Sequence, residues 1–174
     1  EAEAGLIGYW NFDEGEGTVI HDLSGNDRDG ALNNTTESDV WQDGILGGSV
    51  RLDGLNDRVY ISGHSGEQKS IALWFDPGFA LEDNGTAVRL CEMRWVSTNR
   101  QIWLNDLNSS ISGEVLSFKD KAGGITYVTE ANANFSNGWN HLALVWDGGL
   151  SRYRMYLNGT ETDVNASASG HTAY

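Results

Sequence analysis

The most suggestive stretch for chemistry runs from Leu90 to Leu104, where two tryptophans alternate with charged and amide side chains. A pyranose ring presents an apolar C–H face and a rim of hydroxyl groups, so a sugar site needs an aromatic plane and planar hydrogen-bonding partners such as Arg, Asn, Gln and Glu. The stretch supplies both kinds of group, in Trp95, Trp103, Glu92, Arg94, Asn99, Arg100 and Gln101. Tyr127 and Arg154 could extend the site, and we predict that these residues bind carbohydrate. An ordinary pair of strands, with Trp103 in the core and the charges in solvent, is the other interpretation.

A second group of polar side chains lies between Asp22 and Gly30. Asp22, Asn26 and Asp29 offer carboxylate and amide oxygens at short spacing, and Gly25 and Gly30 let the loop bend back. Calcium takes about six to eight oxygen ligands and accepts backbone carbonyls among them. The segment therefore predicts a structural calcium site at Asp22, Asn26 and Asp29. The helical flanks and terminal glutamate of an EF-hand are missing, and an Asx-turn loop without metal explains the same residues.

The sequence gives weaker indications of a catalytic site than of the two binding sites above. A glycoside hydrolase needs two carboxylates at a set separation, and the Glu-x-Asp-x-Glu strand signature of such enzymes does not occur in the sequence. The nearest approaches are residues 13–16, which lie in a turn, and Glu92 with Asp106, which lack a partner on the same strand. The four histidines accompany no nucleophile motif. Whether the protein is an enzyme stays open, and a polysaccharide lyase with a His or Tyr base and an Arg neutraliser is the enzyme class retained.

Composition excludes several other classes of function. Among 174 residues, 25 are Asp or Glu and 11 are Lys or Arg, so the formal net charge is −14. Such a chain repels the phosphates of nucleic acid and of anionic lipid, and we predict neither as a partner. The lone Cys91 excludes a disulfide within the chain and a zinc site built from cysteines.

Two features point to a secreted or extracellular protein. Residues 1–4, Glu-Ala-Glu-Ala, look like the remnant of a processed secretion leader, so we exclude them and treat residues 5–174 as a single domain. Sequons for N-glycosylation occur at Asn33, Asn34, Asn84, Asn108, Asn134, Asn158 and Asn165. A surface rich in Asn, Ser and Thr also produces sequons by chance.

Short alternating apolar runs predict the strands that would position these groups. Candidate strands lie around residues 6–12, 50–52, 59–61, 71–75, 116–118, 125–127, 142–146 and 153–157. Asn-Gly and Asp-Gly pairs such as Asn158-Gly159 mark tight turns between them. No stretch has a sustained helical period with caps. The sequence therefore predicts an all-β fold, a two-sheet antiparallel sandwich.

The order and spacing of these segments resemble the laminin-G-like, concanavalin A-like jelly-roll domains. The segments that carry the resemblance are Gly5–Thr18, Asp22–Gly30, Trp41–Gly44, Val50–Gly54, Asp57–Ile61, Ser70–Phe75, Gly138–Gly148 and Tyr153–Gly159. The resemblance implies a jelly roll with a structural calcium near the Asp22 hairpin. It also implies packing roles for Trp10, Trp41, Trp74, Trp139 and Trp146.

The resemblance raises a question about the C-terminal strands. Members of this family normally continue after the segment that matches residues 153–159 with closing strands beside the N-terminal strand. Only residues 160–174 follow here, enough at about 3.3 Å each for one strand and a turn. We therefore expect an open apolar edge at Leu6–Phe12, which recruits a second copy of the chain or a C-terminal segment outside this sequence.

These features predict a non-catalytic carbohydrate-binding, lectin-like or adhesive module of a secreted or cell-surface protein, with a polysaccharide or glycan as its partner. A polysaccharide-degrading enzyme on the same fold is one alternative. A protein–protein adhesion module without sugar binding is the other.

Overall fold

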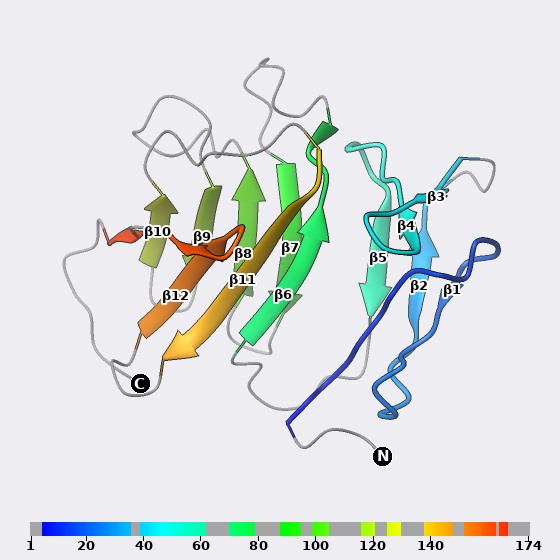
Figure 1. Cartoon of the computed structure of the whole chain (residues 1–174), viewed down its shortest axis with the longest axis horizontal. Helices are drawn as coiled ribbons and strands as arrows, with labels where there is room; N and C mark the ends of the chain where they lie inside the picture. The colour runs from blue at the N-terminus through cyan, green and yellow to red at the C-terminus, as the bar shows by residue number, and fades with distance from the viewer. Residues whose placement is uncertain are drawn as a thin grey trace. The chain divides into compact units, whose positions relative to one another are not determined.

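The computed structural model describes residues 5–35, 39–61, 70–78, 88–94, 99–104, 116–120, 125–129, 138–147, 152–162 and 164–166. These residues form fourteen strands and their connections, and none of them lies in an α-helix (Figure 1). A helix that is long and apolar enough to cross a membrane is likewise not found among them. The chain divides into two compact units, Glu1–Gln68 and Lys69–Tyr174.

The first unit contains a three-stranded antiparallel sheet and a separate hairpin. The sheet has the order β1 (Val19–Ile20), β2 (Gly30–Asn33), β5 (Arg58–Ile61), and the hairpin pairs β3 (Trp41–Asp43) with β4 (Gly48–Val50). Alternation along β2 buries every second residue, as expected of a strand with one face in the core.

The core of the first unit consists of Ile20, Leu32 and Val40. Burial of each such side chain contributes about 1.5–3 kcal/mol, and further partly buried side chains pack around them. These are Trp10, Phe12, Trp41, Val50 and Val59. The packing roles predicted for Trp10 and Trp41 agree with this arrangement.

The strand predicted at Leu6–Phe12 does not form, and that prediction is wrong. The backbone of this segment bonds to the following loop instead: the Tyr9 N–H donates to Asp22 Oδ1 at 3.0 Å, and the Tyr9 carbonyl accepts the Leu23 N–H at 2.8 Å. A side-chain acceptor thus takes the place of a neighbouring strand.

The second unit contains a four-stranded antiparallel sheet of order β13-β12-β11-β6. Its strands are β6 (Ser70–Phe75), β11 (Asn140–Asp147), β12 (Arg152–Leu157) and β13 (Thr160–Glu161). Asn158 and Gly159 have φ of 51° and 80° and form the turn between β12 and β13, as the Asn-Gly pair predicted.

This sheet is amphipathic, as the alternation in its strands predicted. One face is buried and carries Phe75, Leu142, Leu144, Met155 and Leu157. Trp74 belongs to the other face and is 51% exposed, so the packing role expected for it is wrong. Alternation along β6 explains the error, because a buried Phe75 places its neighbour on the solvent side.

The second unit also contains a five-stranded antiparallel sheet of order β14-β10-β9-β8-β7. Its strands are β7 (Val88–Arg94), β8 (Asn99–Leu104), β9 (Leu116–Asp120), β10 (Ile125–Thr129) and β14 (Val164–Ala166). Consecutive hairpins order β7 to β10, and β14 adds to the free edge of β10.

Candidate functional site

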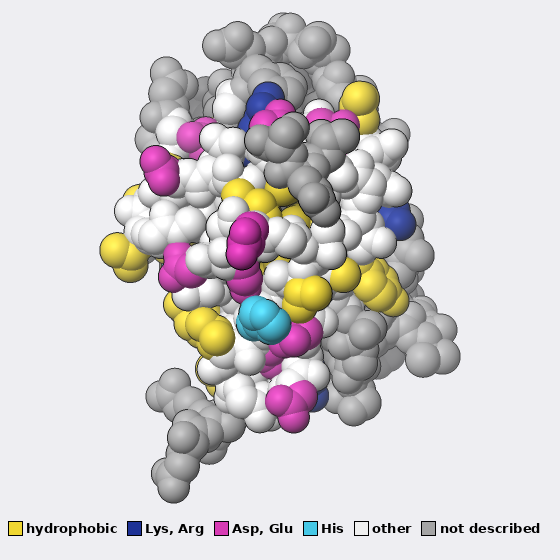
Figure 2. All heavy atoms as spheres, turned by 90° about the vertical axis from the view of Figure 1, so that its right-hand side faces the viewer, with side chains coloured by type: hydrophobic (Ala, Val, Ile, Leu, Met, Phe, Trp, Pro, Cys, Tyr) yellow, Lys and Arg dark blue, Asp and Glu magenta, His cyan; other side chains and the backbone are white. Residues whose placement is uncertain are grey.

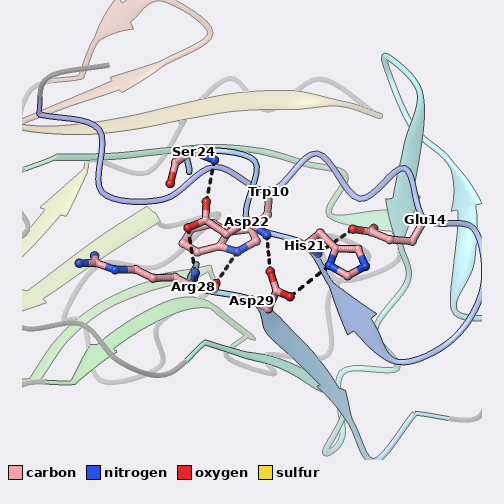
Figure 3. Close-up of polar contacts among 7 residues, drawn as sticks. All are labelled: Trp10, Glu14, His21, Asp22, Ser24, Arg28 and Asp29. Carbon is pink, nitrogen blue, oxygen red and sulfur yellow. Dashed lines mark hydrogen bonds and ion pairs between the residues drawn. The ribbon is translucent and has the colours of Figure 1, made fainter. Parts of the chain in front are cut away.

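Asp22 is the centre of the loop for which calcium was predicted (Figure 3). Its Oδ1 accepts the backbone N–H groups of Tyr9 at 3.0 Å and Ser24 at 2.9 Å, and its Oδ2 accepts the Arg28 N–H at 3.1 Å. Partial burial would raise the pKa of Asp22. The Ser24 hydroxyl and the three backbone donors outweigh that cost and lower the pKa from 3.8 to about 2. The carboxylate therefore stays ionised and organises the loop.

Asp29 continues the same network. Its Oδ1 accepts the Asp22 N–H at 2.8 Å, and its Oδ2 lies 3.1 Å from His21 Nδ1. These two contacts, the backbone donor first, lower the pKa of Asp29. Glu14 Oε1 accepts the His21 N–H at 2.8 Å, and the Trp10 indole donates to the Arg28 carbonyl at 3.0 Å. Side chains thus supply hydrogen-bond partners for the backbone N–H and C=O groups of this irregular loop.

The third predicted calcium ligand, Asn26, lies in the same loop but faces the N-terminal segment. Its Nδ2 donates to the Leu6 carbonyl at 2.9 Å and the Ser24 hydroxyl at 3.0 Å. Both oxygens of Asp22 already accept N–H donors, an arrangement that fits the Asx-turn interpretation and leaves Asp22 little capacity for a cation. The described part of the chain holds no group of three or more His, Cys, Asp or Glu side chains suited to a metal. Calcium at Asp22, Asn26 and Asp29 stays a prediction.

The stretch predicted to bind sugar forms the β7–β8 hairpin. Backbone register pairs Glu92 with Gln101, Arg94 with Asn99 and Met93 with Arg100. Trp103 pairs with Arg89 on one side and Ser117 on the other. Tyr127 lies in the same sheet, in β10, two strands from β8. Trp95 falls outside the described residues. The backbone thus gathers most of the predicted set on one sheet.

Arg154, the last predicted residue, lies on the other sheet of the second unit, in β12. Its Nη1 donates to the Tyr156 hydroxyl at 3.3 Å, and its Nε lies 3.4 Å from Glu161 Oε1. Its side chain is 33% exposed and that of Glu161 is 43% exposed. Arg154 therefore belongs to a polar group with Tyr156 and Glu161, separate from the β7–β8 hairpin.

The same sheet also presents an aromatic group that the sequence pattern did not indicate as a site. Trp74 in β6 pairs in register with His141 in β11, and their ring centroids lie 4.9 Å apart at 56°. In the next row, exposed Ala72 pairs with Ala143, which pairs with Tyr156. Strands lie about 4.8 Å apart and residues rise about 3.3 Å along a strand, so Trp74 and Tyr156, two strands and two residues apart, are separated by about 12 Å, with Ala72 and Ala143 between them.

We call this face the Trp74 platform; it comprises Trp74, His141, Ala72, Ala143, Tyr156, Arg154 and Glu161. A weak signal for it existed in the sequence, because Leu73 and Phe75 share one face of β6 and so put Trp74 on the other. The pairing of Trp74 with His141 had no such signal, since the two residues are distant in the chain.

Comparison with known families identifies the superfamily of this chain. Residues 47–174 match a family model described as the concanavalin A-like lectin/glucanases superfamily. The chain belongs to this superfamily. The predicted fold, an all-β antiparallel jelly-roll sandwich, is confirmed. Searches of curated proteins and of solved structures find no significant match.

Membership of the concanavalin A-like superfamily leaves the activity open, because its description names both lectins and glucanases. Hydrolysis of a glycoside needs a pair of carboxyl groups. Among the side chains that the structure describes on the Trp74 platform, Glu161 supplies the carboxylate, and Arg154 pairs with it.

Proposed function

We propose that this chain is a non-catalytic, lectin-like carbohydrate-binding module of a secreted or cell-surface protein. The observation that carries the proposal is the half-exposed Trp74 on a sheet face that also bears His141, Tyr156, Arg154 and Glu161.

Leaving an indole in water costs free energy. Trp74 is 51% exposed, although a tryptophan gains considerable free energy from burial. A sugar ring stacked on the indole would cover this apolar surface, and neighbouring polar side chains would bond the hydroxyl rim. Arg154 is held by Tyr156 and Glu161, so little side-chain entropy is lost when a ligand binds to it.

The β7–β8 hairpin is a second proposed element of the same function. Its backbone register brings Glu92 opposite Gln101 and Arg94 opposite Asn99, as a shared site on this hairpin requires. Trp103 would supply the aromatic plane there. The module would then contact a glycan through both sheets of the second unit.

The test is a glycan array followed by pull-down on the polysaccharides that give a signal. We expect Trp74→Ala to weaken retention at least about tenfold, the equivalent of about 1.4 kcal/mol, because stacking on an exposed aromatic is lost. Tyr60→Ala is the matched control, since Tyr60 is an exposed aromatic of the first unit. Arg154→Gln should also weaken binding while the melting temperature changes little, because partly exposed ion pairs contribute only about 0–1 kcal/mol.

The alternatives give different results in the same assays. New reducing or unsaturated ends in the bound polysaccharide would identify an enzyme and overturn the non-catalytic proposal. Retention that is equal in wild type, Trp74→Ala and Arg154→Gln would remove the platform from the site. Absence of any glycan signal would overturn carbohydrate binding and favour a protein–protein adhesion module.

A further inference from the structure

The first unit contains an open pocket of about 400 Å³ that the proposed function does not use. It lies where the segment around Phe12 meets the β3–β4 hairpin, and its size falls within the range of small-molecule sites. The residues that line it are Phe12, Asp13, Gly15, Trp41, Gln42, Asp43, Gly47 and Gly48.

The walls of the pocket are held by short hydrogen bonds. Asp13 Oδ1 accepts the Gly48 N–H at 2.6 Å, and Asp13 Oδ2 accepts the Asn11 side-chain N–H at 2.6 Å. The Trp41 indole donates to the Gly17 carbonyl at 3.1 Å, which fixes the plane of its ring. The pocket is therefore formed before a ligand arrives, and a preformed site loses less entropy on binding.

The backbone of the pocket carries strain that its surroundings maintain. Phe12 has a φ of 60°, a left-handed conformation that is unfavourable for a bulky residue. The Phe12 carbonyl packs so closely against Gly48 that a Cβ atom there would collide with it. A strained backbone conformation of this kind persists only where the surrounding contacts hold it in place, and such conformations are frequent at binding sites. The pocket is therefore a candidate binding site.

The charged residues that line the pocket are both acidic, and acidic residues predominate around it. Asp13 and Asp43 line it, and no Lys or Arg is among its lining residues. Residues 1–68 contain 14 acidic and three basic residues, a formal charge of −11, against −3 for residues 69–174. Figure 2 shows Asp and Glu side chains spread over the face on the right of Figure 1, with few Lys or Arg side chains among them. This environment repels anions and attracts cations.

We propose that this pocket binds a protonated amino sugar. The aromatic rings of Trp41 and Phe12 would contact the apolar face of the sugar ring, and an ammonium group near an indole gains cation–π attraction as well. Asp43, exposed on β3, would pair with the ammonium group. The choice of a sugar as the carrier of this group rests on the proposed function, whereas its positive charge follows from the pocket itself.

The experiment compares two oligosaccharides of equal length that differ in charge at one position, a glucosamine oligomer and its N-acetylated counterpart. Binding is followed by NMR at the Trp41 indole and the Gly48 amide, at a pH at which the free amines are protonated. We expect these signals to shift with the glucosamine oligomer and to respond at least about threefold more weakly to the acetylated one.

Protein variants isolate the carboxylate. Asp43→Asn should weaken glucosamine binding about threefold to fivefold, the upper part of the range for a partly exposed ion pair, and should leave binding of the acetylated oligomer unchanged. Asp27→Asn is the matched control: it removes the same charge from an exposed loop position outside the pocket.

Several results would overturn this inference. An amino-sugar site would be refuted by equal affinity for the two oligomers. It would also be refuted by an equal loss of glucosamine affinity in Asp43→Asn and Asp27→Asn, or by tighter binding of a lysine oligopeptide than of the glucosamine oligomer. A glycan that shifts the Trp74 indole and leaves Trp41 unchanged would refute the inference while supporting the proposed function. Glucosamine binding at Trp41 without any glycan response at Trp74 would support the inference while removing the platform.

Discussion

Replacing Asp22 with asparagine tests the claim that a single carboxylate organises the first loop. The side chain keeps its size, but Oδ2, which accepts the Arg28 N–H at 3.1 Å, becomes an NH₂ group that faces a donor. The negative charge that three backbone N–H groups stabilise is lost as well. The variant should therefore fold with a lower free energy of unfolding.

The magnitude follows from the pKa of Asp22, which is lowered from 3.8 to about 2 in the folded chain. Each pKa unit corresponds to about 1.4 kcal/mol, so the upper bound is about 2.5 kcal/mol. Asp22 is partly open to solvent, which screens these contacts, and we expect about 1–1.5 kcal/mol at neutral pH. A folded-state pKa below the unfolded value stabilises the protein above about pH 4, and the contribution is lost as the pH falls towards 2.

The assay is urea unfolding of wild type, Asp22→Asn and Asp27→Asn from pH 7 to pH 2. The gap between wild type and Asp22→Asn should be about 1–1.5 kcal/mol above pH 4 and should close on approach to pH 2. Asp27 is exposed in the same loop, and its substitution should change stability by less than about 0.5 kcal/mol. A gap that is constant across the pH range, or equal in the two variants, would refute the role given to Asp22.

Two further predictions concern the same unit. Gly48→Ala should destabilise the protein by about 1–3 kcal/mol in thermal or urea unfolding, because the new Cβ collides with the Phe12 carbonyl. Gly54→Ala is its control: Gly54 has a φ of 76° but open space around it, so it should cost only about 1 kcal/mol, and an equal loss at both positions would argue against the close approach. If Asp22, Asn26 and Asp29 bind calcium, the ion at about 100 times Kd should stabilise the native state by roughly 2.7 kcal/mol, and a melting temperature unaffected by calcium and chelator would remove the site.

Strand positions and faces were largely predictable, because hydrophobic alternation reports burial directly. The runs at residues 71–75, 142–146 and 153–157 became β6, β11 and β12, and Phe75, Leu142, Leu144, Met155 and Leu157 lie on the buried face. Leu6–Phe12 had a similar pattern but formed no strand. There the decisive interaction is a hydrogen bond to the Asp22 side chain, which a pattern of apolar residues does not encode.

The candidate sites were less predictable, because they depend on pairing between distant segments. The Asp22 loop was recognised from the local spacing of its carboxylates, which accept the N–H groups of Asp22, Ser24 and Arg28 within the loop. The Trp74 platform instead requires β6 beside β11 and β11 beside β12. The Gly-containing segments after Asp147 and Leu157 predict β11 beside β12 and β12 beside β13, but β6 and β11 are far apart in the chain, so the local sequence does not contain the pairing of Trp74 with His141.

The net charge of the whole chain likewise does not describe each of its two units. A net charge of −14 predicts repulsion of anionic glycans wherever they approach. The second unit nevertheless holds eight of the 11 basic residues, and the Trp74 platform includes one of them, Arg154. The pocket of the first unit has acidic lining and no basic side chain within it. The two units should therefore differ in the charge of the sugar that each tolerates, and a polysaccharide with both amino and neutral residues offers a suitable group to each.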